Sequence, residues 1–117
     1  MNIHGQSGLP ITKQKQIEDF IRRNSIDILN CQEINIEEDT FSQCSFLSSN
    51  FTTISNNAQN KYGTASLIKN DFNAENITMD KEGRIIIFEV GGITCGNLYL
   101  QSGTDAFFKG KKRALLL

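Results

Sequence analysis

Two adjacent glycines, Gly91 and Gly92, separate two apolar runs in the later part of the chain. The runs extend from Arg84 to Val90 and from Ile93 to Leu100, and both are rich in β-branched or large apolar residues. Glycine adopts the positive φ values that a two-residue hairpin turn requires, and apolar runs on both sides of such a pair are typical of strands. The sequence therefore predicts an antiparallel hairpin, which commits this half of the chain to β-structure.

Apolar residues at helical spacing predict a helix in the first part of the chain, from Thr12 to Asn24. Ile17, Phe20 and Ile21 fall at positions i, i+3 and i+4, so they form one apolar stripe on such a helix. Thr12 is of a residue type that caps helix starts, and Asn24 is of a type that adopts the left-handed conformation at helix ends. We expect these two residues to bound the helix.

The remaining segments alternate between strand and loop signals. A short strand is predicted from Ser25 to Leu29, running directly into Cys31-Gln32-Glu33, and another from Thr64 to Lys69. The Ser/Asn-rich region from Ser42 to Asn60 is predicted to be a loop with one short strand. The order of helix, strand, loop and several antiparallel strands predicts an α+β fold with a mixed, largely antiparallel sheet and a flanking helix.

Length and charge limit the classes of function. The chain has 117 residues, enough for one small domain, and its net charge of −1 provides no global field that would draw it to nucleic acid. Its three cysteines form no CxxC pair, which is typical of reduced intracellular thiols rather than of disulfides or a zinc site. Without a signal peptide or a run of membrane-spanning length, we expect an intracellular protein, cytoplasmic or nuclear, with no membrane partner.

Two polar residues at predicted strand ends are candidates for chemistry. Asn2 follows the start of the chain in Asn2-Ile3-His4-Gly5, and Glu33 closes the strand that begins near Ser25. Strand ends in sheets of α/β proteins hold side chains rigidly while leaving them accessible, so ligand sites gather there. Amide and carboxylate oxygens are hard ligands, which favour Mg²⁺ over zinc.

Five segments, taken together and in order, resemble the endonuclease/exonuclease/phosphatase superfamily, and specifically its non-LTR retrotransposon branch of apurinic-site endonuclease-like domains. They are Asn2-x-x-Gly5, Ile26-Asp27-Ile28-Leu29-x-x-Gln32-Glu33, Lys61-Tyr62-Gly63-Thr64-Ala65, Gly83-Arg84-Ile85-Ile86-Ile87 and Asn97-Leu98-Tyr99-Leu100-Gln101-Ser102-Gly103. The resemblance implies that residues 1–117 are a partial domain, the N-terminal half of a four-layer α/β sandwich.

The resemblance also implies roles for individual residues. Glu33 would ligate Mg²⁺, and Asn2 would hydrogen-bond near the metal and the scissile phosphate. Tyr99 would place its hydroxyl near the phosphate, and Asn97 would support that strand end. The implied substrate and partner is DNA, and the implied reaction is Mg²⁺-dependent nicking of a phosphodiester bond.

Other parts of the family's site have no counterpart in this sequence. The family's general base, a His paired with an Asp, is missing, and His4 resembles a polar loop position instead. Asp71-x-Asn73 has the spacing of the family's Asp-x-Asn pair but falls between early strands. Gln101 stands where the family usually has proline. Both termini, Met1 and Leu117, are expected to be cut, and the chain is predicted to be catalytically incomplete.

Alternatives from other classes of function stay open at this point. The chain could be a non-enzymatic remnant of a mobile element, a small binding module without turnover, or a phosphatase or lipid-directed member of the superfamily. Individual residues also have ordinary interpretations. Glu33 could begin the acidic surface run at Glu37, Tyr99 could be a plain strand aromatic, and the basic run from Lys109 to Arg113 could be a solvated helix start rather than a DNA-facing patch.

Overall fold

A computed structural model describes residues 10–35, 41, 43–57 and 62–100, without the side chains of residues 33–35 and 62. The described part consists of helices and strands joined by short links. In chain order they are α1 (Ile11–Asn24), β1 (Ile28–Asn35), α2 (Ser45–Asn50), β2 (Phe51–Asn56), β3 (Tyr62–Lys69), β4 (Glu75–Met79), β5 (Ile85–Val90) and β6 (Ile93–Leu98).

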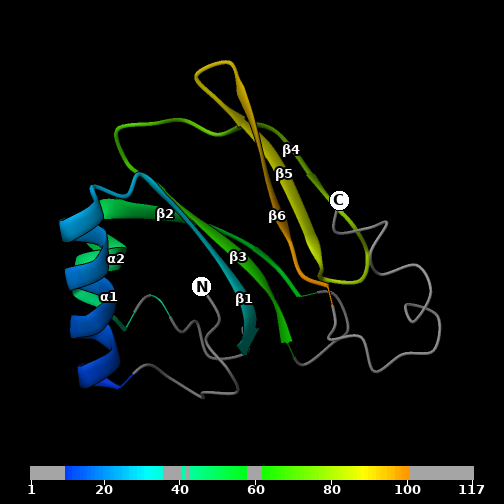
Figure 1. Cartoon of the computed structure of the whole chain (residues 1–117). Coiled ribbons are helices and arrows are strands. Elements are labelled where there is room, and N and C mark those ends of the chain that lie inside the picture. The colour runs from blue at the N-terminus through cyan, green and yellow to red at the C-terminus, as the bar shows by residue number, and fades with distance from the viewer. Residues whose placement is uncertain (1–9, 36–40, 42, 58–61, 101–117) are drawn as a thin grey trace.

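The strands form two three-stranded sheets, which we call sheet A and sheet B. Sheet A has the order β1-β3-β2 and sheet B the order β4-β5-β6, and every pairing among the described strands is antiparallel. The helices cover one face of sheet A, and sheet B lies against the other face, so the described part has three layers (Figure 1). The predicted α+β class is confirmed.

Sheet A lies between two hydrophobic clusters, and the composition of β3 reflects this position. Its residues from Gly63 to Ile68 are all buried. Ala65 and Leu67 pack in the cluster with Ile17 and Ile21 of α1, whereas Ile68 packs in the cluster with β5. A strand covered on both faces reads as a continuous buried run rather than an alternating one.

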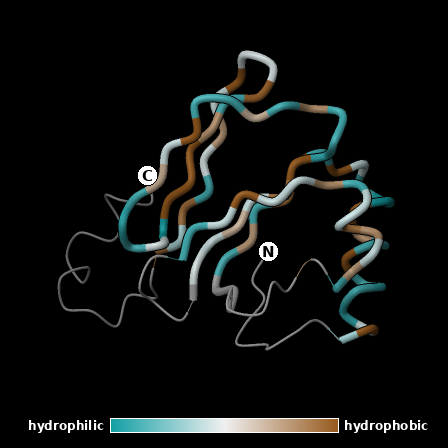
Figure 2. The backbone as a smooth tube through the Cα atoms, turned by 180° about the vertical axis from the view of Figure 1, so that it is seen from behind, coloured by the Kyte–Doolittle hydropathy of each residue, from teal (hydrophilic) through white to brown (hydrophobic). Residues whose placement is uncertain are grey.

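Sheet B contributes its inner face to the second cluster through β5. Ile86, Phe88 and Val90 alternate along this strand and are buried against Ile68. Most of this strand is coloured as apolar in Figure 2. The alternation explains how a run of isoleucines is accommodated, because Ile87, between two buried neighbours, stays partly exposed.

The predicted hairpin between β5 and β6 is confirmed. Val90 pairs with Ile93, and the two residues between them, Gly91 and Gly92, have φ values of 57° and 81°. Both glycines occupy the left-handed region, where residues with a Cβ atom are strained.

The helix prediction is confirmed in extent but wrong in its caps. The N-cap is Pro10 rather than Thr12, and no side chain caps the start; the Pro10 carbonyl instead accepts the Gln14 amide at 2.9 Å. The left-handed residue at the end is Ser25, with φ 50°. Asn24 is the last helical residue, and its side chain donates to the carbonyl of Phe20.

Two elements differ from the sequence prediction for identifiable reasons. The region predicted to be a loop with one strand contains β2, as expected, but also α2, a single short helix whose packing depends on Leu47. β4 was not predicted, because all five of its residues are exposed and an edge strand without a buried side shows no alternation. β1 starts at Ile28, later than predicted, and continues to Asn35.

Candidate active site

The two strand ends that carry Glu33 and Tyr99 lie on the same side of the molecule (Figure 1). Glu33 belongs to β1, at the point where the pairing with β3 shifts register between Gln32 and Ile34. Tyr99 directly follows β6 and is partly buried. Such register irregularities bend a strand and redirect side chains, and they are frequent next to active sites. We call this region, from Gln32 and Glu33 to Asn97 and Tyr99, the candidate site edge.

Asn97 lies at the centre of a buried polar cluster between the two sheets. Its Oδ1 accepts a hydrogen bond from Nε2 of Gln32 at 2.7 Å. Its Nδ2 faces three acceptors: the carbonyls of Ala65 at 3.0 Å and Cys31 at 3.3 Å, and Oγ of Ser66 at 3.2 Å. The side chain is therefore satisfied on both sides although Asn97 is only 1% exposed.

Two further hydrogen bonds connect this cluster to Asn30 of β1 and to Gly96 of β6. Ser66 donates to Oδ1 of Asn30 at 2.7 Å, and Nδ2 of Asn30 lies 3.4 Å from the carbonyl of Gly96 on β6. We call Asn97, Gln32, Ser66 and Asn30 the Asn97 cluster. Because Gln32 precedes Glu33 and Asn97 is two residues before Tyr99, the cluster fixes the two halves of the candidate site edge relative to each other.

The turn between β4 and β5 supports the Tyr99 side of the edge. Oδ1 of Asp80 accepts the backbone amides of Arg84 and Ile85, each at 3.0 Å, and Nδ2 of Asn56 at 2.9 Å. The carbonyl of Arg84 in turn accepts the amide of Tyr99 at 2.8 Å. The Asp80 carboxylate thus holds the backbone segment to which the Tyr99 amide is hydrogen-bonded.

The pKa of the Asp80 carboxyl group is shifted in the folded protein. Partial burial acts to raise its pKa, but hydrogen bonds from the amides of Ile85, Arg84 and Glu82 and from the side chain of Asn56 outweigh burial, so the pKa is lowered. A lowered pKa in the folded state means that the carboxylate stabilises the fold above its unfolded pKa of about 3.9. That contribution is lost as the pH falls through the lower folded value.

Asp80→Asn keeps an oxygen acceptor but removes the charge, so it tests this contribution. At pH 7 we expect the variant to be less stable than wild type by about 1 kcal/mol, a value that allows for solvent screening of this partly exposed group. The difference should shrink as the pH is lowered from 5 to 3. Urea unfolding across that range measures it, with the exposed Asp71→Asn as the matched control. A difference that stays constant with pH would contradict the assignment.

The buried thiol nearest the edge offers no nucleophile. Cys31 is fully buried, and burial raises the pKa of its thiol to about 12. The thiol therefore stays protonated at neutral pH, and its place in the core beside Ala65 and Leu67 is a packing role.

The described residues supply no complete metal centre. Within residues 10–35, 41, 43–57 and 62–100, no three His, Cys, Asp or Glu side chains are grouped so that they could hold a metal ion. Gln32, which precedes Glu33, and Asn97, two residues before Tyr99, hydrogen-bond each other. The side chain of Glu33 lies outside the described residues.

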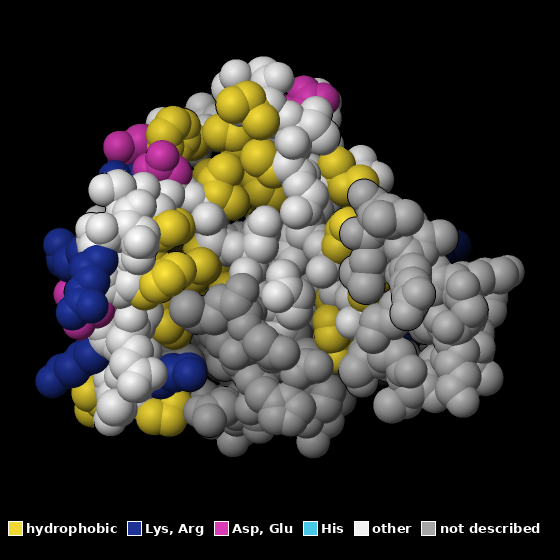
Figure 3. All heavy atoms as spheres, viewed as in Figure 1, with side chains coloured by type: hydrophobic (Ala, Val, Ile, Leu, Met, Phe, Trp, Pro, Cys, Tyr) yellow, Lys and Arg dark blue, Asp and Glu magenta, His cyan; other side chains and the backbone are white. Residues whose placement is uncertain are grey.

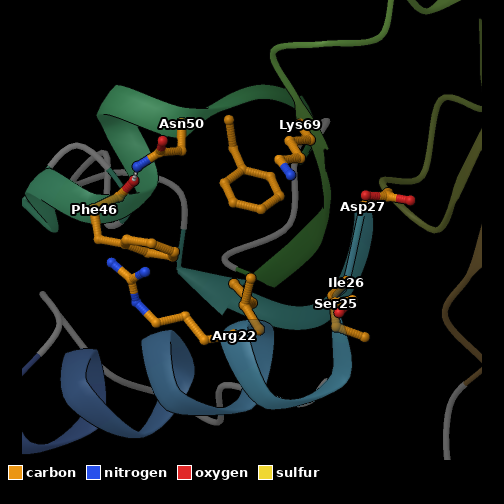
Figure 4. A pocket seen from close by; sticks show the side chains of 9 residues that line it. Arg22, Ser25, Ile26, Asp27, Phe46, Asn50 and Lys69 are labelled. Carbon is orange, nitrogen blue, oxygen red and sulfur yellow. Dashed lines mark hydrogen bonds between the residues drawn. The ribbon is translucent and has the colours of Figure 1, made fainter.

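A separate cavity of about 370 Å³ lies at the opposite end of sheet A. It is lined by the last turn of α1, by α2 and by the end of β3. The guanidinium of Arg22 lies 4.8 Å from the centre of the Phe46 ring on one side, and Lys69 approaches from the other (Figure 4). On the face of the molecule shown in Figure 3, the Lys and Arg side chains gather mainly along α1. This cavity is remote from Glu33 and Tyr99, and it contributes nothing to the candidate site edge.

Solved structures of other proteins resemble the structure of this chain. No family model matches the sequence, and no curated protein matches it. An AP endonuclease from Archaeoglobus fulgidus matches with a TM-score of 0.64 at 19% identity, over 90% of this chain and 42% of that one. TDP2 from Caenorhabditis elegans matches with a TM-score of 0.59 at 21% identity, over 90% of this chain and 34% of that one.

The chain has part of the endonuclease/exonuclease/phosphatase fold. A truncated form of TDP2 from C. elegans agrees, with a TM-score of 0.58 over 89% of this chain and 44% of that one. The chain thus spans less than half of these solved structures, and at 19–21% identity the likeness concerns the nuclease-like fold. No helix in the described part is long and apolar enough to cross a bilayer.

Some of the candidate site residues lie in the described part of the chain, and others lie outside it. Glu33 lies in β1 near its end, Tyr99 directly follows β6, and the hydrogen bond between Gln32 and Asn97 connects these two strands. Asn2 and His4 lie outside the described residues, as does the basic run from Lys109 to Arg113.

Sequence reasoning gave no role to Arg84, Asp80 or Ser66. The Asp80-Lys81-Glu82-Gly83 turn carries a recognisable signal, since an Asp before a turn accepts backbone amides beyond it. The position of Ser66 opposite Asn97 follows only from how the two sheets pack, and no local pattern reports it.

Proposed function

We propose that residues 1–117 are part of a Mg²⁺-dependent phosphodiester-cleaving domain that nicks DNA, related to the endonucleases of non-LTR retrotransposons. The observation that carries this proposal is the meeting of the Glu33 and Tyr99 strand ends at one edge, joined by the 2.7 Å hydrogen bond between Gln32 and Asn97. The fold shared with an AP endonuclease supports it.

Each residue has a distinct part in this proposal. Glu33 would hold Mg²⁺, which when bound polarises a phosphoryl oxygen of the substrate. Asn2 and the hydroxyl of Tyr99 would donate hydrogen bonds to the phosphate, and Asn97 would keep the Tyr99 strand end in place. Because the chain's net charge is −1, its attraction to DNA would have to come from local contacts at this edge.

Metal binding can be tested without turnover. Mn²⁺ is a paramagnetic substitute for Mg²⁺ that broadens NMR signals close to it. If Glu33 holds the metal, Mn²⁺ should broaden the side-chain amide signals of Gln32 and Asn97 in the wild type, and this broadening should be lost in Glu33→Gln. The amide of Asn24, at the far end of α1, is the internal control. Equal broadening in both proteins would remove Glu33 from the metal site.

Turnover by these 117 residues alone is expected to be near zero. The only histidine of the chain is His4, and no counterpart of the family's His–Asp base is present, although such a base contributes roughly 10²–10⁴-fold in rate. In a supercoiled-plasmid nicking assay with Mg²⁺, the wild type should not exceed Glu33→Ala. Strong nicking that Glu33→Ala abolishes would show that the site is complete and that this expectation is wrong.

A second candidate function is DNA or ligand binding without catalysis. It is favoured by the lack of a group of three metal-binding side chains in the described residues. The two candidates differ in metal dependence: DNA binding that EDTA and Glu33→Gln leave unchanged would support a binding module, whereas binding strengthened by Mg²⁺ through Glu33 would support the nuclease-related site.

A further inference from the structure

Arg84 is a cation at the candidate site edge to which neither the sequence motifs nor the comparisons give a role. It directly precedes β5, and its side chain is 30% exposed, so most of it is covered by the protein. On β5 the alternating residues Ile86 and Phe88 face sheet A, and Arg84 precedes Ile86 by two positions. Alternation along a strand therefore directs Arg84 toward the same inner side.

Tyr99 reaches the same place from the neighbouring strand. It follows Asn97 by two residues, and the side chain of Asn97 faces sheet A, where it contacts the carbonyls of Cys31 and Ala65. The 2.8 Å hydrogen bond from the Tyr99 amide to the Arg84 carbonyl continues the antiparallel pairing of β5 and β6 beyond Ile85 and Leu98. Residues opposite each other in such a pair have neighbouring side chains on one face.

Hydrogen bonds hold the backbone of Arg84 and of the turn that precedes it. Its amide donates to Oδ1 of Asp80 at 3.0 Å, and that oxygen also accepts Nδ2 of Asn56. Gly83, just before it, has φ 77° and leaves room for the backbone of Asn57, 3.1 Å from where a Cβ would lie. The carbonyl of Gly83 accepts the Thr64 hydroxyl at 3.2 Å. Arg84 therefore projects from an anchored turn, which lowers the entropic cost of using it in binding.

We propose that Arg84 binds a phosphate of the DNA strand beside Tyr99, which rests on the proposed function of this edge. Among the described residues, the guanidinium of Arg84 has one ionic contact, with Glu82 at 3.6 Å, and the Glu82 side chain is 68% exposed. A long contact to an exposed carboxylate contributes little, so a phosphate, which accepts two parallel N–H bonds from a guanidinium, replaces Glu82 readily. Arg84 then supplies the local positive charge that the net composition lacks.

The test is binding of a fluorescein-labelled DNA duplex, measured in EDTA by fluorescence anisotropy at several KCl concentrations. Loss of one phosphate contact in Arg84→Gln should weaken binding about tenfold at low salt and reduce the slope of log K against log[salt] by about 0.9. Arg84→Lys keeps the charge and should keep the slope. Arg23→Gln removes the same charge from an exposed position on α1 and should bind like the wild type.

A second experiment observes the side chain of Arg84 directly by NMR. In protein labelled with ¹⁵N-arginine, the Nε–H signal of Arg84, identified by its absence in Arg84→Gln, should shift when a short deoxyoligonucleotide is added. If the wild type binds DNA while Arg84→Gln has the same affinity and slope, Arg84 is not the phosphate contact and the proposed function stands. If the wild type binds neither probe, both proposals are overturned. A thermal melt of Arg84→Gln, with Arg84→Lys as the rescue variant, separates misfolding from lost contact.

Discussion

Replacing Asn97 by alanine is expected to lower the free energy of unfolding by about 3 kcal/mol, the largest loss among single side chains of the candidate site edge. Asn97 is 1% exposed, and its side-chain amide has four hydrogen-bonding partners on two other strands, β1 and β3. Alanine would leave Nε2 of the partly buried Gln32 without this acceptor. A buried polar group without a partner costs more than an average hydrogen bond contributes, because its hydration has already been lost.

Urea unfolding followed by circular dichroism measures this loss. The matched control is Asn24→Ala at the exposed end of α1, where the amide makes one bond and alanine suits the helix; a change within about 0.5 kcal/mol is expected there. Asn97→Asp separates hydrogen bonding from volume, since it keeps the shape but turns an acceptor toward the carbonyls of Ala65 and Cys31. At neutral pH it should be at least as unstable as Asn97→Ala. A near-neutral Asn97→Ala would mean that the Asn97 cluster does not hold the sheets together.

Gly63→Ala is expected to be almost as damaging, for a steric reason. A Cβ at Gly63 would collide with the carbonyl oxygen of Asn56 and lie 2.8 Å from Cα of Asn57. Both are backbone atoms, so no rotamer change relieves the overlap and the strand end itself has to move. We expect a loss of about 2–3 kcal/mol. Gly63 also pairs with Ile34, beside Glu33, so the same displacement would reach the candidate site edge.

Thermal unfolding of Gly63→Ala is best compared with that of Gly96→Ala. Both glycines are in strands, but nothing lies within 4 Å of a Cβ at Gly96, so that substitution should change stability by less than about 0.5 kcal/mol. Equal melting temperatures for the two variants would show that β2 and β3 can separate at this point without cost.

How far the sequence predicts this fold depends on whether a signal is local. The Gly91-Gly92 hairpin and the apolar face of α1 at Ile17 and Ile21 are local, and both were predictable. Phe20 belongs to the same apolar stripe by spacing but is 43% exposed, because the helix covers sheet A with only part of that stripe. β4 and α2 left too weak a periodic signal, the first because it is exposed throughout and the second because it is one short helix.

The candidate site edge shows the same limit. Glu33 and Tyr99 could be named from ordered motifs, since Glu33 closes one recognisable strand and Tyr99 falls within another, and their functional roles remain predictions. The contacts that connect them could not be named, because Gln32 and Asn97 are 65 residues apart and meet only when two sheets pack. Asn97 and Ser66 also contradict the usual pattern of apolar residues at positions that face a core. Such polar residues in a core are understandable only in pairs, and pairing across sheets is a property of the assembled fold.

The division of the strands between the sheets has a consequence for how this chain assembles. Sheet A is built from residues 28–69 and sheet B from residues 75–98, and a single link, residues 70–74, joins them. Each sheet is therefore contiguous in sequence and can form before the other is present. The Asn97 cluster can form only in the docking that follows. The hydrogen bonds of the cluster favour one arrangement of the two sheets. If sheet B were shifted by one residue along sheet A, the Asn97 amide would be buried without these partners.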